Sequence, residues 1–499
     1  MAREVTKKVY KNIVFGFGGQ MLILAISIVL PRMILVSYGS DTNGLTSAIT
    51  QVFAYLALLE AGIGNASINL LYKNIAAKDY NAINDTISGT RRYFYKILPI
   101  YTFCVAVFAC VYPEVVHTEV SHKTIRLIIL IQGLGAIINF AFTNTFTQLL
   151  IADGRNYVVS NLNLMVKFLS AAAQILLINY GYDIVCIQYA YLVFFVIKAI
   201  IINIYVKKQY DWLDYRRKIS TKILSQRNAF VIHEISGVIF SSTDVFVLSM
   251  FCSMKVASVY AVYNLVFSSL NSFISVVIKG FDFTLGHEYN RDKTSYVKLH
   301  DTYECLYMCL VFAVLTTACV LTLPFIRLYT RDITDINYVD KYLPPLFAMI
   351  QLLSCSRAIS SKLITIADKA KETIPRAILE DAINLTVSVL LVSRIGIYGV
   401  LIGTIVALLY RTNDIIIYAN RKILHRMPFK AYRNMAVDFL AFGSFYFIFS
   451  QVTLPITSYY NFIVWGSLTF AVILSAFIVI NLLAEKSLAR FLLRSIKKR

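Results

Sequence analysis

The sequence predicts an all-α polytopic membrane protein with about fourteen transmembrane helices, arranged as two six-helix bundles followed by an extra helix pair. Three observations predict this fold class. The composition is strongly apolar, the apolar residues are grouped into long stretches, and a short segment recurs at a fixed distance in the two halves of the chain.

The composition indicates a lipid environment for most of the chain. Apolar residues make up 58% of the 499 residues and charged residues only 15%, with a mean hydropathy of +0.65. A soluble protein of this length would need far more polar surface. A helix needs roughly 20 apolar residues to cross a bilayer. The stretches that meet this requirement are residues 13–37, 45–70, 94–113, 125–149, 158–179, 184–206, 229–251, 259–283, 303–327, 342–366, 376–395, 397–419, 435–455 and 461–483.

An internal repeat relates the two halves of the chain. Ile151-Ala152-Asp153 recurs as Ile366-Ala367-Asp368, an offset of 215 residues (366 minus 151), and the same offset relates Gly181 to Gly396. An offset shared by sequence and hydropathy indicates duplication. The expected domains are an N-terminal six-helix bundle (1–206), a basic cytoplasmic linker (207–227), a C-terminal six-helix bundle (228–420), an extra transmembrane helix pair (434–485) and a basic cytoplasmic tail (486–499).

The basic residues predict the orientation in the membrane. The chain has 48 Lys and Arg against 28 Asp and Glu, and most of the basic residues fall in alternate connections and in the tail. Because cytoplasmic loops are enriched in Lys and Arg, both termini are expected in the cytoplasm. The basic residues are scattered and do not interleave with an aromatic platform, which argues against a nucleic-acid partner. The first apolar stretch has no small-residue cleavage site after it, so it is expected to stay as a helix.

The sequence lacks the motifs of enzymatic or metal chemistry. None of the eight cysteines belongs to a CxxC pair, and His233-Glu234 lacks the second histidine of a zinc-protease helix. There is also no P-loop and no G-x-S-x-G elbow. We therefore expect no catalytic residue, no metal and no cofactor, and we do not expect an enzyme.

Function is expected to depend on ionisable side chains near the middle of the predicted spans. A charge there costs about 2.5–3.5 kcal/mol on insertion scales, so it needs a partner or a role. Pairing between helices is one interpretation, but two anions cannot neutralise five cations. We therefore expect a cationic cavity for phosphate or acidic sugars, because Arg matches phosphate oxygens in pairs and Lys supplies a point charge. The cations are Arg32, Lys167, Lys198, Arg357 and Arg411, and the anions are Glu60 and Asp244.

Three stretches carry a family resemblance. They are PRMILVSYGSDTNGL, GLTSAITQVFAYLALLEAGIG with the basic connection after it, and STDVFVLSMFCSMKVASVYAVYNLV. They resemble the Wzx-type polysaccharide flippases, which handle O-antigen and capsule precursors within the multidrug/oligosaccharidyl-lipid/polysaccharide exporter superfamily. The family has a glycine-tyrosine turn after the Asp-containing helix, whereas Ser258-Val259-Tyr260 lacks the glycine.

The resemblance implies a transporter of the bacterial cytoplasmic membrane. It would flip a polyprenyl-diphosphate-linked oligosaccharide by alternating access, for cell-surface polysaccharide synthesis. The deep cations, Arg32 among them, would receive the diphosphate or acidic sugars. Glu60 and Asp244 would sense a coupling H⁺ or Na⁺. Expected partners are the lipid-linked glycan, membrane lipids, a polysaccharide polymerase and glycosyltransferases.

Three other functions stay open. A lipid II flippase of the same superfamily would also have about fourteen spans and a cationic cavity. A drug or cation antiporter of the superfamily usually has fewer spans and a negatively charged cavity. A membrane polysaccharide polymerase or ligase would need a large outer catalytic loop, whereas the longest outer connections, near 113–124 and 328–341, are short.

Overall fold

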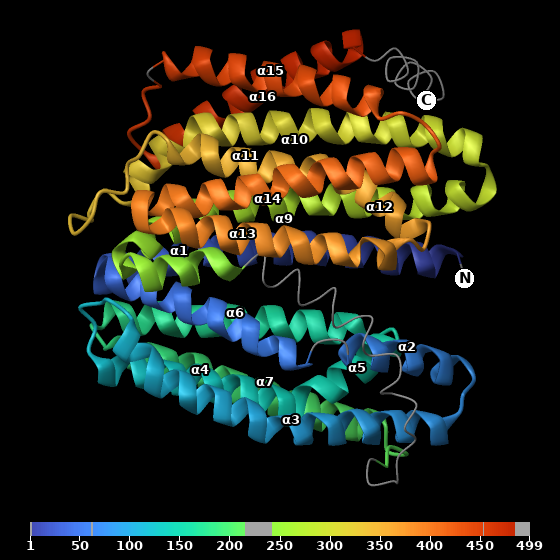
Figure 1. The fold of residues 1–499 in the computed structure, drawn as a ribbon. Coiled ribbons are helices and arrows are strands. Elements are labelled where there is room, and N and C mark those ends of the chain that lie inside the picture. The colour runs from blue at the N-terminus through green and yellow to red at the C-terminus, as the bar shows by residue number, and fades with distance from the viewer. Residues whose placement is uncertain (1, 61–62, 215–241, 453, 485–499) are drawn as a thin grey trace. The chain divides into compact units, whose positions relative to one another are not determined.

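The structure, a computed structural model, describes residues 2–60, 63–214, 242–452 and 454–484, and every regular element in these residues is a helix (Figure 1). Contacts divide the chain into two compact units, Met1–Ser258 (unit 1) and Val259–Arg499 (unit 2). Over the described residues, each predicted span coincides with one helix or with successive helices. The all-α, polytopic fold class is confirmed.

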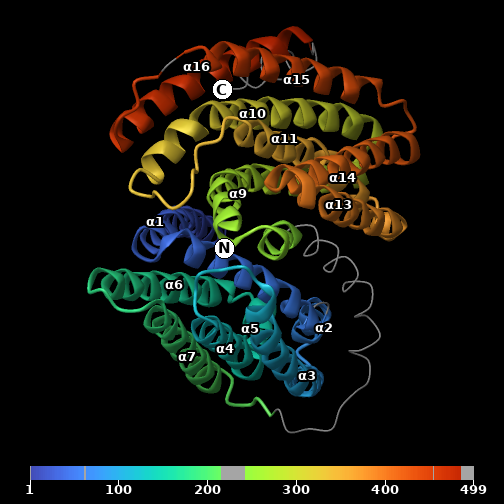
Figure 2. The same cartoon turned by 60° about the vertical axis from the view of Figure 1, so that its left-hand side comes forward.

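Unit 1 is built from helices that pack as neighbouring pairs. α3 packs against α4, and α6 packs against α7 (Figure 2). Its elements are α1 (Ala2–Ala57), η1 (Leu58–Glu60), α2 (Ile63–Ala76), α3 (Tyr80–Val115), α4 (His122–Ile138), the π-helix η2 (Asn139–Thr143), α5 (Asn144–Ala152), α6 (Asn156–Asn179), α7 (Ile184–Gln209), the short helix Ser242–Phe251 and the first residues of α9 (Met254–Arg291).

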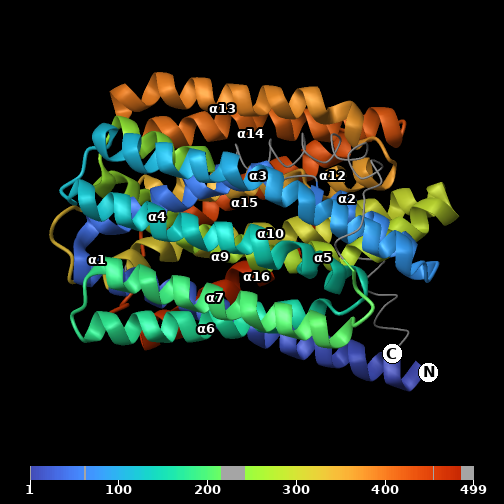
Figure 3. The same cartoon turned by 90° about the horizontal axis from the view of Figure 1, so that it is seen from below.

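Unit 2 contains the rest of α9 and the C-terminal helices. α13 and α14 run side by side (Figure 3), and the final pair, α15 and α16, packs on α10 (Figure 1). Its further elements are α10 (Lys293–Tyr329), α11 (Leu343–Ser356), α12 (Ala358–Ile366), η4 (Ala370–Thr373), α13 (Ile374–Ile395), α14 (Ile397–Tyr418), the π-helix η5 (Ala419–Ile423), α15 (Phe429–Ser450) and α16 (Tyr459–Ala484).

Nine helices in the described part of the chain are long and apolar enough to cross a membrane. α13 and α15 are outside this set because charged residues such as Glu380 and Asp438 interrupt their apolar sequence. α11 and α12 are outside it because the helix breaks at Arg357 into two short pieces. The predicted spans therefore correspond to helices, but not every one is uniformly apolar.

Two helix ends that the predicted repeat relates have the same capping geometry. α5 ends in a left-handed residue, Gly154 (φ 74°), and α12 ends in a left-handed residue, Asp368 (φ 55°). The next N–H donates back to the last helical turn in both places, from Arg155 to the Leu150 carbonyl and from Lys369 to the Ile364 carbonyl. This is the Schellman closure. The capping geometry thus repeats at 214 residues, one fewer than the sequence offset.

Two predicted spans form one helix in the structure. α1 covers 13–37 and the start of 45–70, with a kink at Gly39 (φ 80°) as the only interruption. Past the kink, the Asn43 amide donates to the Ser258 hydroxyl at 2.7 Å, a pair separated by the repeat offset of 215 residues. The predicted linker 207–227 lies outside the described residues from 215 on, as does the tail 486–499.

Replacing Gly44 with alanine is expected to destabilise unit 1. A Cβ at Gly44 would lie 1.9 Å from the Met254 carbonyl oxygen, and backbone cannot give way as a flexible side chain can. Overpacking of this kind costs typically about 1–3 kcal/mol. Thermal unfolding in detergent should show a lower Tm for Gly44→Ala. The control is Gly443→Ala, another helical position, where a Cβ meets nothing within 4 Å. Equal Tm values for the two variants would contradict the packing.

Candidate functional site

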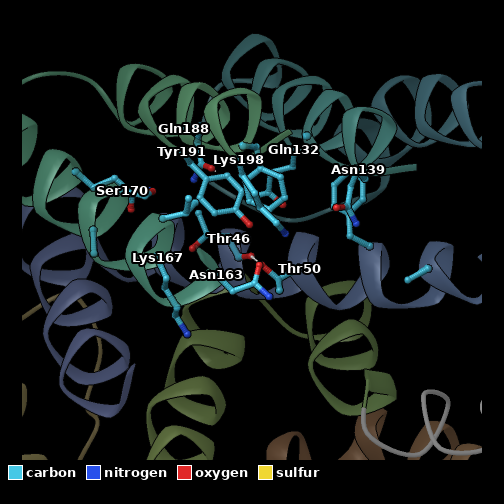
Figure 4. Close-up of a pocket in the computed structure, with 18 of the residues that line it drawn as sticks. Thr46, Thr50, Gln132, Asn139, Asn163, Lys167, Ser170, Gln188, Tyr191 and Lys198 are labelled. Carbon is cyan, nitrogen blue, oxygen red and sulfur yellow. Dashed lines mark hydrogen bonds between the residues drawn. The ribbon is translucent and has the colours of Figure 1, made fainter. Parts of the chain in front are cut away.

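Unit 1 contains a cavity between its helices, lined by apolar and polar side chains (Figure 4). Its volume is about 650 Å³, within the range of roughly 300–1,000 Å³ that is typical of small-molecule sites. Side chains from α1, η1, α3, α4, η2, α6 and α7 line it. All the residues that line the cavity therefore belong to a single unit.

Two of the predicted deep cations line this cavity. They are Lys167 on α6 and Lys198 on α7. Lys198 is half-buried, and its Nζ lies 5.5 Å from the centroid of the Phe195 ring. Figure 4 shows Lys198 among the polar side chains, whereas Lys167 extends from α6 away from that group. Both lysines that line the cavity are therefore among the cations predicted from the sequence.

Neutral polar side chains make up much of the remaining wall. The Gln132 amide donates to the Gln188 side-chain oxygen at 3.4 Å, and the Gln174 amide donates to the Ser170 hydroxyl at 3.1 Å. Amide and hydroxyl groups both donate and accept hydrogen bonds, as sugar hydroxyls do. These residues were not predicted from the sequence, because single uncharged polar residues in a span give only a weak signal.

Glu60 brings a carboxylate to the same cavity. It lies in η1, where the helix path is broken between α1 and α2, and it accepts a hydrogen bond from the Asn144 side chain. Asn139 and Phe140, at the start of the π-helix η2, also line the cavity. π-helical turns are frequent at functional sites. Glu60, the predicted deep anion, and the π-helix η2 therefore both contribute to the wall of the cavity.

The predicted arginines of unit 2 lie in a buried ion-pair network. Arg357 Nη1 is 2.7 Å from Glu380 Oε1, and Arg411 Nε is 3.4 Å from Glu380 Oε2. Arg411 Nη1 is also 2.6 Å from Asp414 Oδ2. Glu380 is only 6% exposed and Arg411 only 7%. The prediction of two deep anions was too low, because it omitted Glu380 within span 376–395 and Asp414 within span 397–419.

The remaining predicted residues lie elsewhere in unit 1. Arg32 is half-buried on α1 and does not line the cavity. Asp244 is buried in the helix Ser242–Phe251, beside Thr243, whose hydroxyl is 2.6 Å from the Tyr55 hydroxyl. The structure thus brings Lys167, Lys198 and Glu60 together, and it places Arg32 and Asp244 outside their cavity.

Comparison with known proteins places this fold among membrane transporters. No protein-family model and no curated protein sequence matches the chain. The lipid II flippase MurJ, in an inward closed conformation, is similar with a TM-score of 0.69 at 12% identity, over 93% of this chain and 98% of that one. A multidrug resistance MATE family transporter of the MOP superfamily, inward-facing, gives 0.58 at 14% identity, over 79% and 95%.

A MATE family transporter in an outward-facing conformation is also similar, with a TM-score of 0.53 at 14% identity, over 86% of this chain and 93% of that one. At these identities the likeness establishes the fold. The chain is therefore a multi-pass membrane protein with the fold of MOP-superfamily transporters. The similar structures are transporters and not enzymes.

Proposed function

We propose that the protein flips polyprenyl-diphosphate-linked oligosaccharides across the bacterial cytoplasmic membrane, by alternating access, for the synthesis of cell-surface polysaccharide such as O-antigen or capsule. The observation that carries this proposal is the cavity of unit 1, whose partly apolar wall presents two lysines together with amide and hydroxyl groups. Lysines attract a phosphate or an acidic sugar, and the neutral groups match sugar hydroxyls. The fold of the similar transporters supports a flippase.

The substrate would divide between cavity and bilayer according to its polarity. Its charged and sugar groups would enter the cavity, where Lys198 and Lys167 replace part of their hydration. The polyprenyl chain would stay among the lipid tails, since each buried CH₂ is worth about 0.8 kcal/mol. The protein would therefore need to accommodate only the head group, for which the volume of about 650 Å³ is suitable.

The other predicted residues have roles in the same proposal. Arg357 and Arg411 would bind substrate phosphate in a state in which Glu380 releases them, and Arg32 would contribute from α1. Glu60 and Asp244 would respond to a coupling H⁺ or Na⁺. Both termini would lie in the cytoplasm. A polysaccharide polymerase and glycosyltransferases would be partners on the pathway of the glycan.

Two alternatives follow from the similar structures. A lipid II flippase is the first, because the similarity to MurJ extends over 93% of this chain. A drug or cation antiporter is the second, because the fold is also similar to that of MATE family transporters. The two lysines of the cavity favour an anionic head group over a cationic drug.

Reconstituted flipping tests the proposed function directly. Purified protein in vesicles is supplied with a fluorescent polyprenyl-diphosphate oligosaccharide, and exposure of the label on the opposite leaflet is measured. We expect transport of this lipid above that of protein-free vesicles. Transport of lipid II alone would support the lipid II flippase. Uptake of cationic dyes without transport of either lipid would support the antiporter.

A further inference from the structure

A line of polar residues runs along the interface between α10, α15 and α16 in unit 2. At one end Asp301 on α10 is bound by Arg426 through two hydrogen bonds, of 2.6 and 3.0 Å, and by Lys430 Nζ at 2.9 Å. Arg426 lies in the connection between α14 and α15, and Lys430 lies in the first turn of α15. This end of the line is therefore at the end of the helices, where α15 begins.

The line continues into the helices at four-residue spacing. Residues 430, 434 and 438 of α15 lie on one face, because four residues make about one helical turn. Glu304 of α10 and Asn434 of α15 line the same small cavity, of about 10 Å³. This volume is near the lower limit for a single water molecule, and the site offers the polar partners that a water needs.

Asp438 is the inner end of the line. Its side chain is fully buried, with 0% exposure, in the middle of α15. Its Oδ1 accepts a hydrogen bond from the Asn481 amide on α16 at 2.8 Å, and the Asn481 oxygen accepts one from the Cys305 thiol on α10 at 3.3 Å. Its Oδ2 is buried and has no hydrogen-bond partner among the described residues. Half of this carboxyl group is therefore unsatisfied.

Within the part of the chain that the structure describes, no cation lies beside Asp438 to compensate a charge. α10 presents Glu304, Cys305 and Cys309 towards this region, and α16 from Tyr459 to Ala484 contains no charged residue. Lys430 is engaged by Asp301 two turns away. A buried carboxylate without a compensating cation is strongly unfavourable, whereas a carboxylic acid is neutral because it carries a proton on one oxygen.

We propose that Asp438 is a proton-binding site that couples the transport cycle to the proton gradient, an inference that rests on the proposed transport function. A proton from water at the Asp301–Lys430 end passes by way of Glu304 and the water-sized cavity to Asp438 Oδ2, where an O–H bond forms. The same bond breaks when the proton leaves, so no further reactant is needed. Opening of the α10–α15 interface would control the exchange.

The first test needs no transport activity. The infrared spectrum of unlabelled wild-type protein is compared with that of wild-type protein with ¹³C-labelled aspartate carboxyl groups. At neutral pH, the difference spectrum should contain the C=O band of a protonated aspartic acid. The corresponding difference spectrum of Asp438→Asn should lack this band. Asp438→Asn keeps an oxygen that can accept from Asn481, so folding should be preserved. Asp335→Asn, in the exposed α10–α11 connection, is the matched control and should keep the band. A wild-type spectrum without this band would overturn the proposal, with or without a folded variant.

The second test measures coupling. Flipping of the polyprenyl-diphosphate oligosaccharide should be stimulated severalfold by a pH gradient in wild type and in Asp335→Asn, and the stimulation should disappear in Asp438→Asn. Equal stimulation in Asp438→Asn, or flipping by wild type that ignores the gradient, would overturn the coupling role. If wild type flips no such lipid, the proposed function fails, and the infrared band alone decides whether Asp438 holds a proton.

Discussion

Lys198→Gln is expected to reduce flipping of the polyprenyl-diphosphate oligosaccharide by about 10- to 100-fold. Hydrogen bonds to charged groups contribute about 1.5–3 kcal/mol, and each 1.36 kcal/mol lost from the transition state is a factor of ten in rate. Lys198 is half-buried in the cavity, so water would only partly replace its charge. Glutamine keeps most of the side-chain length and removes the charge. Initial flipping rates at fixed protein-to-lipid ratio measure the effect.

The matched control is Lys207→Gln, at the exposed end of the same helix α7. It removes the same charge from α7 but not from the cavity, and its flipping rate should stay near that of wild type. Lys167→Gln should have a smaller effect than Lys198→Gln, because Lys167 is more exposed. Equal rates for Lys198→Gln and Lys207→Gln would remove the cavity from the proposed mechanism.

Among the variants expected to affect stability, Glu380→Ala should lower the free energy of unfolding the most. Glu380 bridges Arg357 at 2.7 Å and Arg411 at 3.4 Å, with both of its oxygens engaged and little exposure. Removing one partner of a buried ion pair costs about 3–5 kcal/mol; here Arg357 would lose this carboxylate, while Arg411 would keep Asp414. The apparent Tm in detergent should fall by many degrees, and the yield of folded protein should fall with it.

The comparison for this variant is Glu372→Ala, which removes another carboxylate of unit 2. Glu372 pairs with Lys369 at 2.6 Å on the surface, where both side chains are about half exposed. The Lys369 ammonium holds the pKa of this carboxyl below its ordinary value. Exposed pairs of this kind contribute little to stability. A Tm for Glu380→Ala close to that of Glu372→Ala would mean that the buried network does not hold α11, α13 and α14 together.

The sequence was informative where a single residue type or a long pattern decides the structure. Apolar stretches gave the helices, because a span needs its side chains to match lipid along its whole length. The repeat located helix ends at Gly181 and Gly396, both of which have a positive φ. Lys167 and Lys198 could be identified because a charge within a span is rare. These inferences need no knowledge of which helices are neighbours.

Contacts between side chains of different helices could not be predicted from the same hydropathy patterns. Arg357, Glu380 and Arg411 come from three different segments, and only the packing of α11, α13 and α14 brings them together. Gln132 and Gln188 are likewise single polar residues on α4 and α7 that become one wall of a cavity. Their importance depends on distances in space, which hydropathy along the chain does not contain.

The sequence by itself therefore determined that this is an all-α membrane protein, and it identified cations within the predicted spans. Only the tertiary structure decided which of those charges are compensated. Arg357 and Arg411 meet carboxylates inside unit 2, while Lys167 and Lys198 line a cavity in unit 1. The physical reason is that the cost of a buried charge depends on the groups within a few ångströms of it, and helix packing sets those neighbours.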